Sequence, residues 1–322
     1  MNEILRVENL TKKFPVQMGI FGTRSGSFIH AVDNINFTVK KGETFGLVGE
    51  SGCGKTTVAK LILKLLFPTS GRIFFDGKDI FRDRKTQMRR RIQLIFQDPY
   101  SSLNPRMTVY DIIGEPLDIH RLTKGNKKKK RILQLMETVG LAPFHLYRYP
   151  HEFSGGQRQR VVIARALAVE PDILIMDEPV SALDVSVRAQ VLNLLEKLQK
   201  EFTLTYIFIS HDLSVVRHVC NRVGVMYLGQ IVELGEINDL FDYPQHPYAE
   251  ALIASVPIPD PRTKKKRELL IGEVPTPIDP PKCCRFVKRC KYAQEKCSQE
   301  EPPLEEIRKD HWTACFYPAD SR

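Results

Sequence analysis

The sequence predicts an α/β protein with a parallel β-sheet at its core. Strand-like apolar runs alternate with helical patterns between residues 172 and 235. This alternation places parallel strands in one sheet with helices on both faces. A glycine-rich loop at residues 49–57 also follows a strand and precedes a helix. Two regions add to this pattern: residues 1–96 are rich in short strands, and residues 98–160 are helical.

Length and composition indicate a globular chain with a large core and an appended tail. The 322 residues are 42% hydrophobic and 27% charged, which is ordinary for a folded protein. No apolar run reaches the roughly 18 residues that a membrane-spanning helix needs. The N-terminus MNEILRVENL lacks the pattern of a secretory signal. We therefore expect a cytosolic chain.

The net charge of +10 permits nucleic acid, anionic lipid or nucleotide as a partner and selects none of them. Basic runs at 127–131 and 264–267 supply much of the excess, without the interleaved aromatic residues of a single-strand-binding surface. We interpret these runs as solvated faces or loops. Contact with lipid headgroups or a protein partner is the alternative.

The first third of the chain reads as short strands separated by turns. The strand-like runs are 4–10, 35–39, 43–49, 72–77 and 91–96. Between them, residues 55–67 carry a helical pattern, with apolar side chains at Val58, Leu61, Ile62, Leu65 and Leu66.

The middle of the chain is helical up to residue 160, and then strands and helices alternate. A helix is expected at 126–141 within the helical insert. The later elements are a strand at 172–178, a helix at 182–200, a strand at 204–210, a turn into 212–220, and two hairpin strands at 222–229 and 230–235. Residues 257–282 are rich in Pro and charge, which indicates a linker or wrapping arm. Beyond them, the tail holds five of the seven cysteines.

The loop GESGCGKTT fits the phosphate-binding pattern G-x-x-x-x-G-K-[ST] in its expected context between strand and helix. Its glycines let consecutive N–H groups face one anion at a helix N-terminus. Lys55 would reach the β and γ phosphates, and Thr56 would hold Mg2+. The candidate nucleotide-binding residues are Gly49, Glu50, Ser51, Gly52, Cys53, Gly54, Lys55, Thr56 and Thr57. A glycine turn that binds nothing is the alternative.

Two adjacent acids end the apolar strand DILIMDE. Burial of unpaired carboxylates is costly, so these acids are expected to act on an ion or a substrate. Asp177 would reach Mg2+, and Glu178 would face the water that attacks the γ phosphate. The other interpretation is that both acids cap the following helix.

A second glycine pair in FSGGQ, residues 153–157, opens another helix. Together with Gln97, SALD at 181–184, His211 and the two phosphate motifs, it resembles the ATP-binding subunits of ABC transporters over residues 1–255. The resemblance implies a P-loop NTPase (RecA-like) fold. That fold has a parallel-sheet core, an antiparallel β subdomain, a helical subdomain at about 98–160 and, here, a cysteine-containing extension at 256–322.

The resemblance also assigns roles to residues. Two subunits close head to tail, so that one subunit's phosphate loop and the other's signature segment hold the same ATP. Gln97 would sense Mg2+ and the attacking water, His211 would contact the γ phosphate, and Phe14 would stack on adenine. The signature residues are Ser154, Gly155, Gly156 and Gln157, and Asp184 would contact the opposite subunit's loop.

Two of these matches are looser. An insert at about 15–28 follows Phe14, and a core phenylalanine is the alternative there. Phe153 replaces the commoner Leu at the start of the signature, a change that keeps its apolar character.

Three stretches look like the peptide importer ATPases of the dipeptide and oligopeptide group: 96–109, 149–160 and 246–257. The first favours the second, F-type ATPase of the pair. The resemblance implies a homologous second ATPase, two integral membrane permease subunits, an extracytoplasmic binding protein, a peripheral position on the cytoplasmic face of the membrane, and no nucleic acid. Import of short sugars or nickel remains open, as does a soluble ATPase acting on nucleic acid or the ribosome.

The tail resembles the same group's C-terminal extension. Cys284, Cys290, Cys297 and Cys315 lack the C-x2-C pairs of common zinc sites. A 4Fe-4S cluster, zinc and plain thiols all remain open, as does a redox or iron sensor that regulates the ATPase. Cys283 is a candidate spare ligand. By contrast, Cys53 and Cys220 are interpreted as ordinary small residues.

Overall fold

The computed structural model describes residues 3–18, 23–82, 88–256 and 275–321. The basic run 264–267 and most of the Pro-rich stretch lie outside the described residues. The chain divides into two units: residues 1–40, 44–83 and 209–322 form the first, and residues 41–43 and 84–208 form the second. The tail therefore groups with the phosphate loop, whereas the helical insert belongs to the other unit.

An antiparallel sheet in the first unit accounts for the strand-rich start of the sequence. Its strands are ordered β2 (Thr23–Lys40), β1 (Glu3–Met18), β4 (Ser70–Phe75) and β5 (Lys78–Asp79). Leu5, Leu10 and Ile35 are fully buried on it, so the alternating apolar residues supply its core. β1 and β2 are longer than the sequence indicated, because they continue as a hairpin into the stretch expected to be an insert.

The first unit also holds strands in the order β11 (Glu305–Arg308), β12 (His311–Thr313), β10 (Gln230–Glu236), β9 (Arg222–Tyr227) and β3 (Thr44–Val48). β3 and β9 pair in parallel, and the remaining pairs are antiparallel. The helices of this unit are α1 (Lys55–Ile62), α8 (Leu213–Val219), α9 (Ile237–Asp242), α10 (Pro247–Ala254), η3 (Val287–Arg289), α11 (Glu295–Gln299) and η4 (Ala319–Ser321).

The predicted helix at 55–67 is shorter than expected. α1 ends at Ile62, Lys64 adopts a left-handed φ of 56°, and Leu65 is 56% exposed. The apolar pattern of the sequence continues beyond Ile62. The helix nevertheless ends there, because the chain turns before the last apolar residues can be buried.

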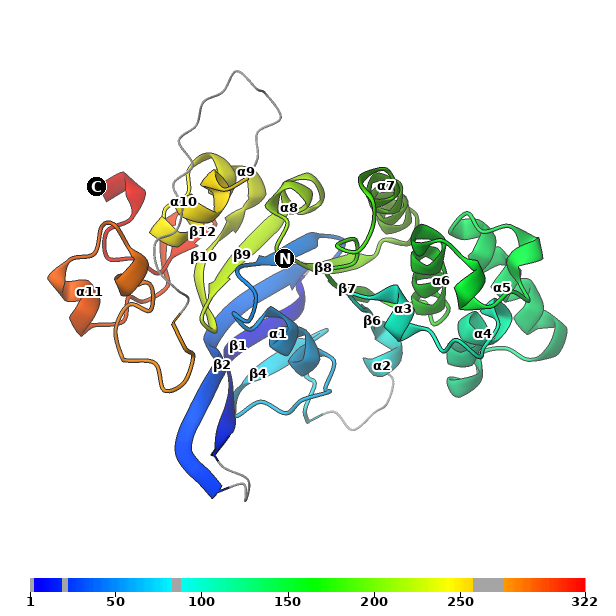
Figure 1. Ribbon diagram of the computed structural model, residues 1–322, viewed down its shortest axis with the longest axis horizontal. Coiled ribbons are helices and arrows are strands. Elements are labelled where there is room, and N and C mark those ends of the chain that lie inside the picture. Colours follow the sequence, from blue (N-terminus) through cyan, green and yellow to red (C-terminus); the bar gives the residue numbers. More distant parts are fainter. Residues whose placement is uncertain (1–2, 19–22, 83–87, 257–274, 322) are drawn as a thin grey trace. The chain divides into compact units, whose positions relative to one another are not determined.

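The tail is built into the first unit at two places. At the first place, backbone hydrogen bonds join Phe28 and His30 of β2 to Asp279 and Pro277. At the second place, β12 pairs with β10, and the fully buried Glu233 of β10 accepts a hydrogen bond from His311 Nε2 at 2.7 Å. Figure 1 shows the tail, drawn from orange to red, beside β10 and α10.

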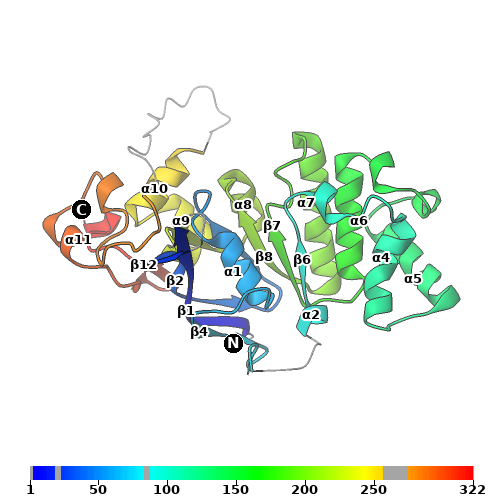
Figure 2. The same ribbon diagram turned by 60° about the horizontal axis from the view of Figure 1, so that its bottom comes forward.

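The second unit holds strands β8 (Thr205–Ser210), β7 (Ile173–Asp177) and β6 (Ile92–Ile95), with β6 and β7 parallel. Its helices are α2 (Met88–Arg91), α3 (Pro99–Ser102), α4 (Val109–Ile119), α5 (Gly125–Thr138), η1 (Pro143–His145), η2 (Pro150–Glu152), α6 (Gly155–Leu167) and α7 (Val185–Phe202). The helices α4, α5 and α6 lie against one another (Figures 1 and 2). Residues 99–160 are therefore mainly helical, as the sequence predicted.

None of the helices within the described residues combines the length and apolarity that crossing a bilayer requires.

Candidate active site

The phosphate loop has a backbone that only glycine allows at two positions. Gly49 has a φ of 149°, and a Cβ atom there would lie 2.2 Å from the Met226 carbonyl oxygen. Gly54 has a φ of 112°, and its Cβ would lie 2.1 Å from the Ala31 carbonyl oxygen. Strands β9 and β2 thus press directly against the loop, so any side chain at either glycine would displace it.

Lys55 begins α1 and is folded back over the loop. Its Nζ donates hydrogen bonds to the carbonyl oxygens of Gly49 at 2.8 Å and Glu50 at 2.9 Å. Gly54 is the N-cap of α1 and makes no side-chain hydrogen bond to the N–H groups of the first turn, and such groups can bind an anion. Ser51 and Thr56 are exposed, with hydroxyl groups accessible to a ligand. Cys53 is buried, which raises the pKa of its thiol, as suits a small packing residue.

Two residues that sequence reasoning missed hold the start of this loop. Tyr248 Oη accepts a hydrogen bond from the Glu50 N–H at 2.9 Å. Arg289 donates from Nη1 and Nη2 to the two carboxylate oxygens of Glu50, at 2.8 and 3.0 Å. This bidentate hydrogen bonding raises the pKa of Arg289. Tyr248 lies in the recognised stretch 246–257, whereas no local pattern marks Arg289.

In the second unit, the structure brings Gln97 and Glu178 together. Gln97 follows β6, Glu178 follows β7, and Gln97 Nε2 donates to Glu178 Oε2 at 2.8 Å. The strands are parallel neighbours, so their carboxyl ends present both side chains at one edge. Asp177 is the last residue of β7. The N-cap of α7 is Asp184, so Asp177 and Glu178 do not cap that helix.

The signature segment forms the N-terminus of α6. Ser154 Oγ accepts from the Gln157 N–H at 3.3 Å, and Gln157 Oε1 accepts from the Ser154 N–H at 3.1 Å, which completes a capping box. A Cβ at Gly156 would lie 2.3 Å from Val187 Cγ1 on α7. The glycine therefore lets the two helices approach closely, next to the segment that contains Asp184.

The other predicted site residues belong to the first unit. His211 follows β8 and is exposed. Phe14 of β1 is only half-buried and pairs with Ile29 of β2, two residues from the Ala31 carbonyl that abuts the loop.

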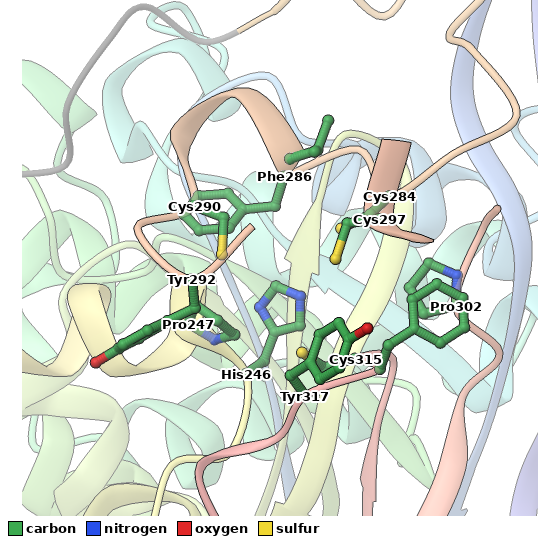
Figure 3. A pocket seen from close by; sticks show the side chains of 12 residues that line it. His246, Pro247, Cys284, Phe286, Cys290, Tyr292, Cys297, Pro302, Cys315 and Tyr317 are labelled. Carbon is green, nitrogen blue, oxygen red and sulfur yellow. The ribbon is translucent and has the colours of Figure 1, made fainter. Parts of the chain in front are cut away.

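A separate pocket in the tail gathers the four predicted cysteines. Figure 3 shows Cys284, Cys290, Cys297 and Cys315 lining it together with His246 of the N-cap of α10. Burial raises the pKa of Cys284 to about 12, and the three other thiols add to this shift. Cys283 is also buried but does not line the pocket.

Within the described residues, no three His, Cys, Asp or Glu side chains are arranged to hold a metal ion. Four cysteines line this one pocket, and cysteine thiolates are soft metal ligands.

Comparison with known proteins agrees with these motifs. The model of the ABC transporter family matches residues 32–181, and the model of the oligopeptide/dipeptide transporter C-terminal region matches residues 232–297. The oligopeptide transport ATP-binding protein AppF of Bacillus subtilis is 49% identical over 97% of this chain and 96% of its own length. The putative oligopeptide transport ATP-binding protein YkfD of the same species is 51% identical over 89% of each chain.

A solved structure supports the same assignment. The ATP-binding cassette MJ0796, solved as a dimer in a post-hydrolysis state with ADP and phosphate, is 30% identical. It aligns with a TM-score of 0.63 over 73% of this chain and 99% of its own. The chain therefore belongs to the ABC transporter ATP-binding proteins, in the branch that carries the oligopeptide/dipeptide transporter C-terminal region, and is an ABC-type ATPase.

Proposed function

We propose that this chain hydrolyses ATP to drive the import of dipeptides or oligopeptides through a membrane ABC transporter. The supporting observation is a similarity that extends beyond the ATPase motifs into the tail, at about half identity with oligopeptide transport proteins over nearly the whole chain. The proposed partners are a homologous ATPase bound head to tail, two membrane permease subunits and, indirectly, an extracytoplasmic binding protein. The chain then lies on the cytoplasmic face of the membrane and binds no nucleic acid.

Each site residue has a role in this proposal. Gly49 to Thr57 hold the phosphates, with Lys55 on the β and γ phosphates. Mg2+ is held by Thr56, Asp177 and Gln97. Glu178 is the general base, since its carboxylate accepts a hydrogen bond from the side chain that orients the attacking water. His211 contacts the γ phosphate, Phe14 stacks on adenine, and Ser154 to Gln157 and Asp184 act on the partner's nucleotide.

Exposed apolar side chains on the helical region support the docking of permease subunits there. Tyr100, Ile119, Phe144 and Tyr147 are 61–69% exposed. Large apolar side chains left in water are candidates for a binding surface. Docking at this surface would place the permease contact on the same unit as Gln97 and Glu178.

Glu178→Gln tests the catalytic assignment. Removing a general base should lower ATP turnover by at least about 100-fold while Mg2+-ATP still binds. The matched control is Glu170→Gln, since Glu170 pairs with Arg131 at the surface of the same unit and its side chain is 66% exposed. Steady-state phosphate release measures both variants, and unchanged turnover in Glu178→Gln would refute the assignment.

The substrate class is tested on the intact transporter isolated through a tag on this chain. Dipeptides or oligopeptides, supplied with the binding protein, should stimulate ATP hydrolysis. Short sugars and nickel should not. Stimulation by sugar or nickel alone would replace the peptide proposal, and co-purification with nucleic acid in a membrane-free fraction would favour the soluble alternative.

We also propose that the tail cysteines hold a 4Fe-4S cluster. Each cysteine of such a cluster binds a different iron atom, so the sulfur atoms lie farther apart than around a single zinc ion. The four cysteines that line one pocket supply the number of thiolates that such a cluster needs. Bound, the cluster would cross-link the tail and supply a redox-active group.

Anaerobic purification followed by iron, sulfide and zinc analysis tests this proposal. About four irons per chain are expected, with their loss in Cys315→Ser and retention in the matched control Cys283→Ser. Protein that contains neither iron nor the visible iron–sulfur absorbance would contradict the proposal, and it would also remove the sensor hypothesis.

A further inference from the structure

Glu50 is a junction between the nucleotide loop and the tail. Its carbonyl oxygen accepts from Lys55 Nζ, its N–H donates to Tyr248 Oη, and its carboxylate pairs with Arg289. The main chain and the side chain of Glu50 thus both form hydrogen bonds. Any displacement of Glu50 moves one of the two carbonyl groups that hold the Lys55 ammonium.

Arg289 is held in place from several directions. Its side chain is 5% exposed, whereas that of Glu50 is 25% exposed. The guanidinium lies over the rings of Tyr227 and Phe286, at 5.8 and 5.9 Å from their centroids, and Nη1 also donates to Tyr227 Oη at 3.4 Å. The Tyr227 and Tyr248 rings contact each other with a tilt of 54° and centroids 4.6 Å apart. Tyr227, Tyr248 and Arg289 therefore form one rigid support, which we call the loop support.

The loop support also reaches the rear of the loop. Tyr227 ends β9, and the residue before it, Met226, has the carbonyl oxygen against which Gly49 is pressed. The loop start is thus fixed from the strand side by Met226 and from the tail side by Arg289. A bidentate guanidinium–carboxylate pair fixes orientation as well as distance, which a lysine in the same place cannot do.

We propose that Arg289 is a positioning residue for ATP binding: through Glu50, it sets the phosphate loop and Lys55 in the geometry that accepts the nucleotide. The tail is then a working part of the nucleotide site as well as an appendage. This inference rests on the proposed assignment of the phosphate loop. Arg289 does not touch the nucleotide itself, so its loss should affect affinity and leave the chemical step nearly intact.

The test measures Mg2+-ATP binding by calorimetry with the full chain, in a Glu178→Gln background that prevents turnover. Arg289→Met should weaken binding by about tenfold or more, and Arg289→Lys by less, because it keeps the charge and loses the fork. Arg308→Met is the matched control. Arg308 is an arginine of the same tail that pairs with Asp320 at the surface, with 44% of its side chain exposed, and binding should stay within about twofold.

A double-variant cycle shows whether Arg289 acts through Glu50. In a Glu50→Gln background, Arg289→Met should add less than about a twofold further loss, because the pair is already broken. In chains with Glu178 intact, KM for ATP should rise while kcat stays within about twofold. A merely structural role would give additive losses and no split between KM and kcat.

Three outcomes separate the alternatives. Wild-type affinity in Arg289→Met overturns the inference. Thermal unfolding without nucleotide shows whether Arg289→Met folds. If it does not fold, Arg289→Lys takes its place, and wild-type ATP affinity in that variant also overturns the inference. Lys55→Ala tests the underlying assignment: retained ATP binding there would refute the phosphate loop itself, whereas its loss alongside a normal Arg289→Met would refute only the role of Arg289.

Discussion

Asp33 shows how a single carboxylate ties the tail to the strand behind the phosphate loop. It accepts hydrogen bonds from His30 Nδ1 at 2.9 Å and from Arg285 Nη2 of the tail. Burial pushes the pKa of Asp33 upward, but the hydrogen bonds from His30 and Arg285 outweigh it and leave that pKa below its usual 3.8. The ionised form is therefore preferred more strongly in the folded chain than in the unfolded one.

This preference gives a pH-dependent contribution to stability. Because the folded pKa is lowered, the contribution is fully present above the unfolded value and is lost as pH falls through the folded value. Asp33→Asn should lower the free energy of unfolding by about 1–3 kcal/mol at pH 7, with the deficit shrinking below about pH 4. Urea denaturation of the wild type and the variant at pH 7 and at pH 3.5 measures this difference in the free energy of unfolding.

The control for this measurement is Asp242→Asn. Asp242 pairs with Arg217 at the surface, with both side chains more than half exposed, so its removal should cost under about 1 kcal/mol. An Asp33→Asn deficit that is equal at pH 7 and at pH 3.5 would exclude the ionised carboxylate as its source.

At the scale of elements, the contact between α6 and α7 limits what the signature segment tolerates. Gly156→Ala places a Cβ 2.3 Å from Val187 Cγ1, which forces the helices apart. ATP turnover of the assembled transporter should fall by about 10- to 100-fold, since displacements of an ångström have effects of this size. ATP binding to the phosphate loop, in the first unit, should stay normal.

A second substitution tests the steric origin of that loss. Val187→Ala removes Cγ1 and leaves Cβ at 3.7 Å, an ordinary contact. The Gly156→Ala/Val187→Ala double variant should therefore recover much of the activity. A double variant as inactive as Gly156→Ala would show that the glycine is needed for another reason.

The elements also show how far sequence reasoning reaches. The phosphate loop, the ends of β6 and β7, and the capped start of α6 are set by residues close together in the chain, so local patterns predict them. The strands β11 and β12 were not predicted. Their charged or very short sequences carry no strand pattern, and they form by pairing at the free edge of β10. The early end of α1 was also missed. The apolar pattern of the sequence continues beyond Ile62, but the side chains there are no longer fully buried.

The Arg289–Glu50 pair could not be predicted from the sequence, for a different reason. The partners are 239 residues apart, and although Glu50 lies in the phosphate-loop motif, no local pattern marks Arg289 as its partner. Only the folded tail brings them together. The closeness of Gln97 and Glu178 could be anticipated in part, because both follow strands of one parallel sheet.

At the scale of the whole molecule, the two units carry different halves of the machinery. The phosphate loop and His211 belong to the first unit, whereas Gln97, Glu178 and the signature segment belong to the second. In the proposed head-to-tail dimer, ATP links the phosphate loop of one subunit to the signature segment of the other. Hydrolysis removes the γ phosphate from that contact, so the nucleotide state controls closure.

The most direct test is the mass of the purified Glu178→Gln chain mixed with its co-purifying homologous partner, determined by analytical ultracentrifugation. A stable dimer is predicted with saturating Mg2+-ATP, and separate subunits with Mg2+-ADP. Subunits that remain monomeric in saturating Mg2+-ATP would contradict the account.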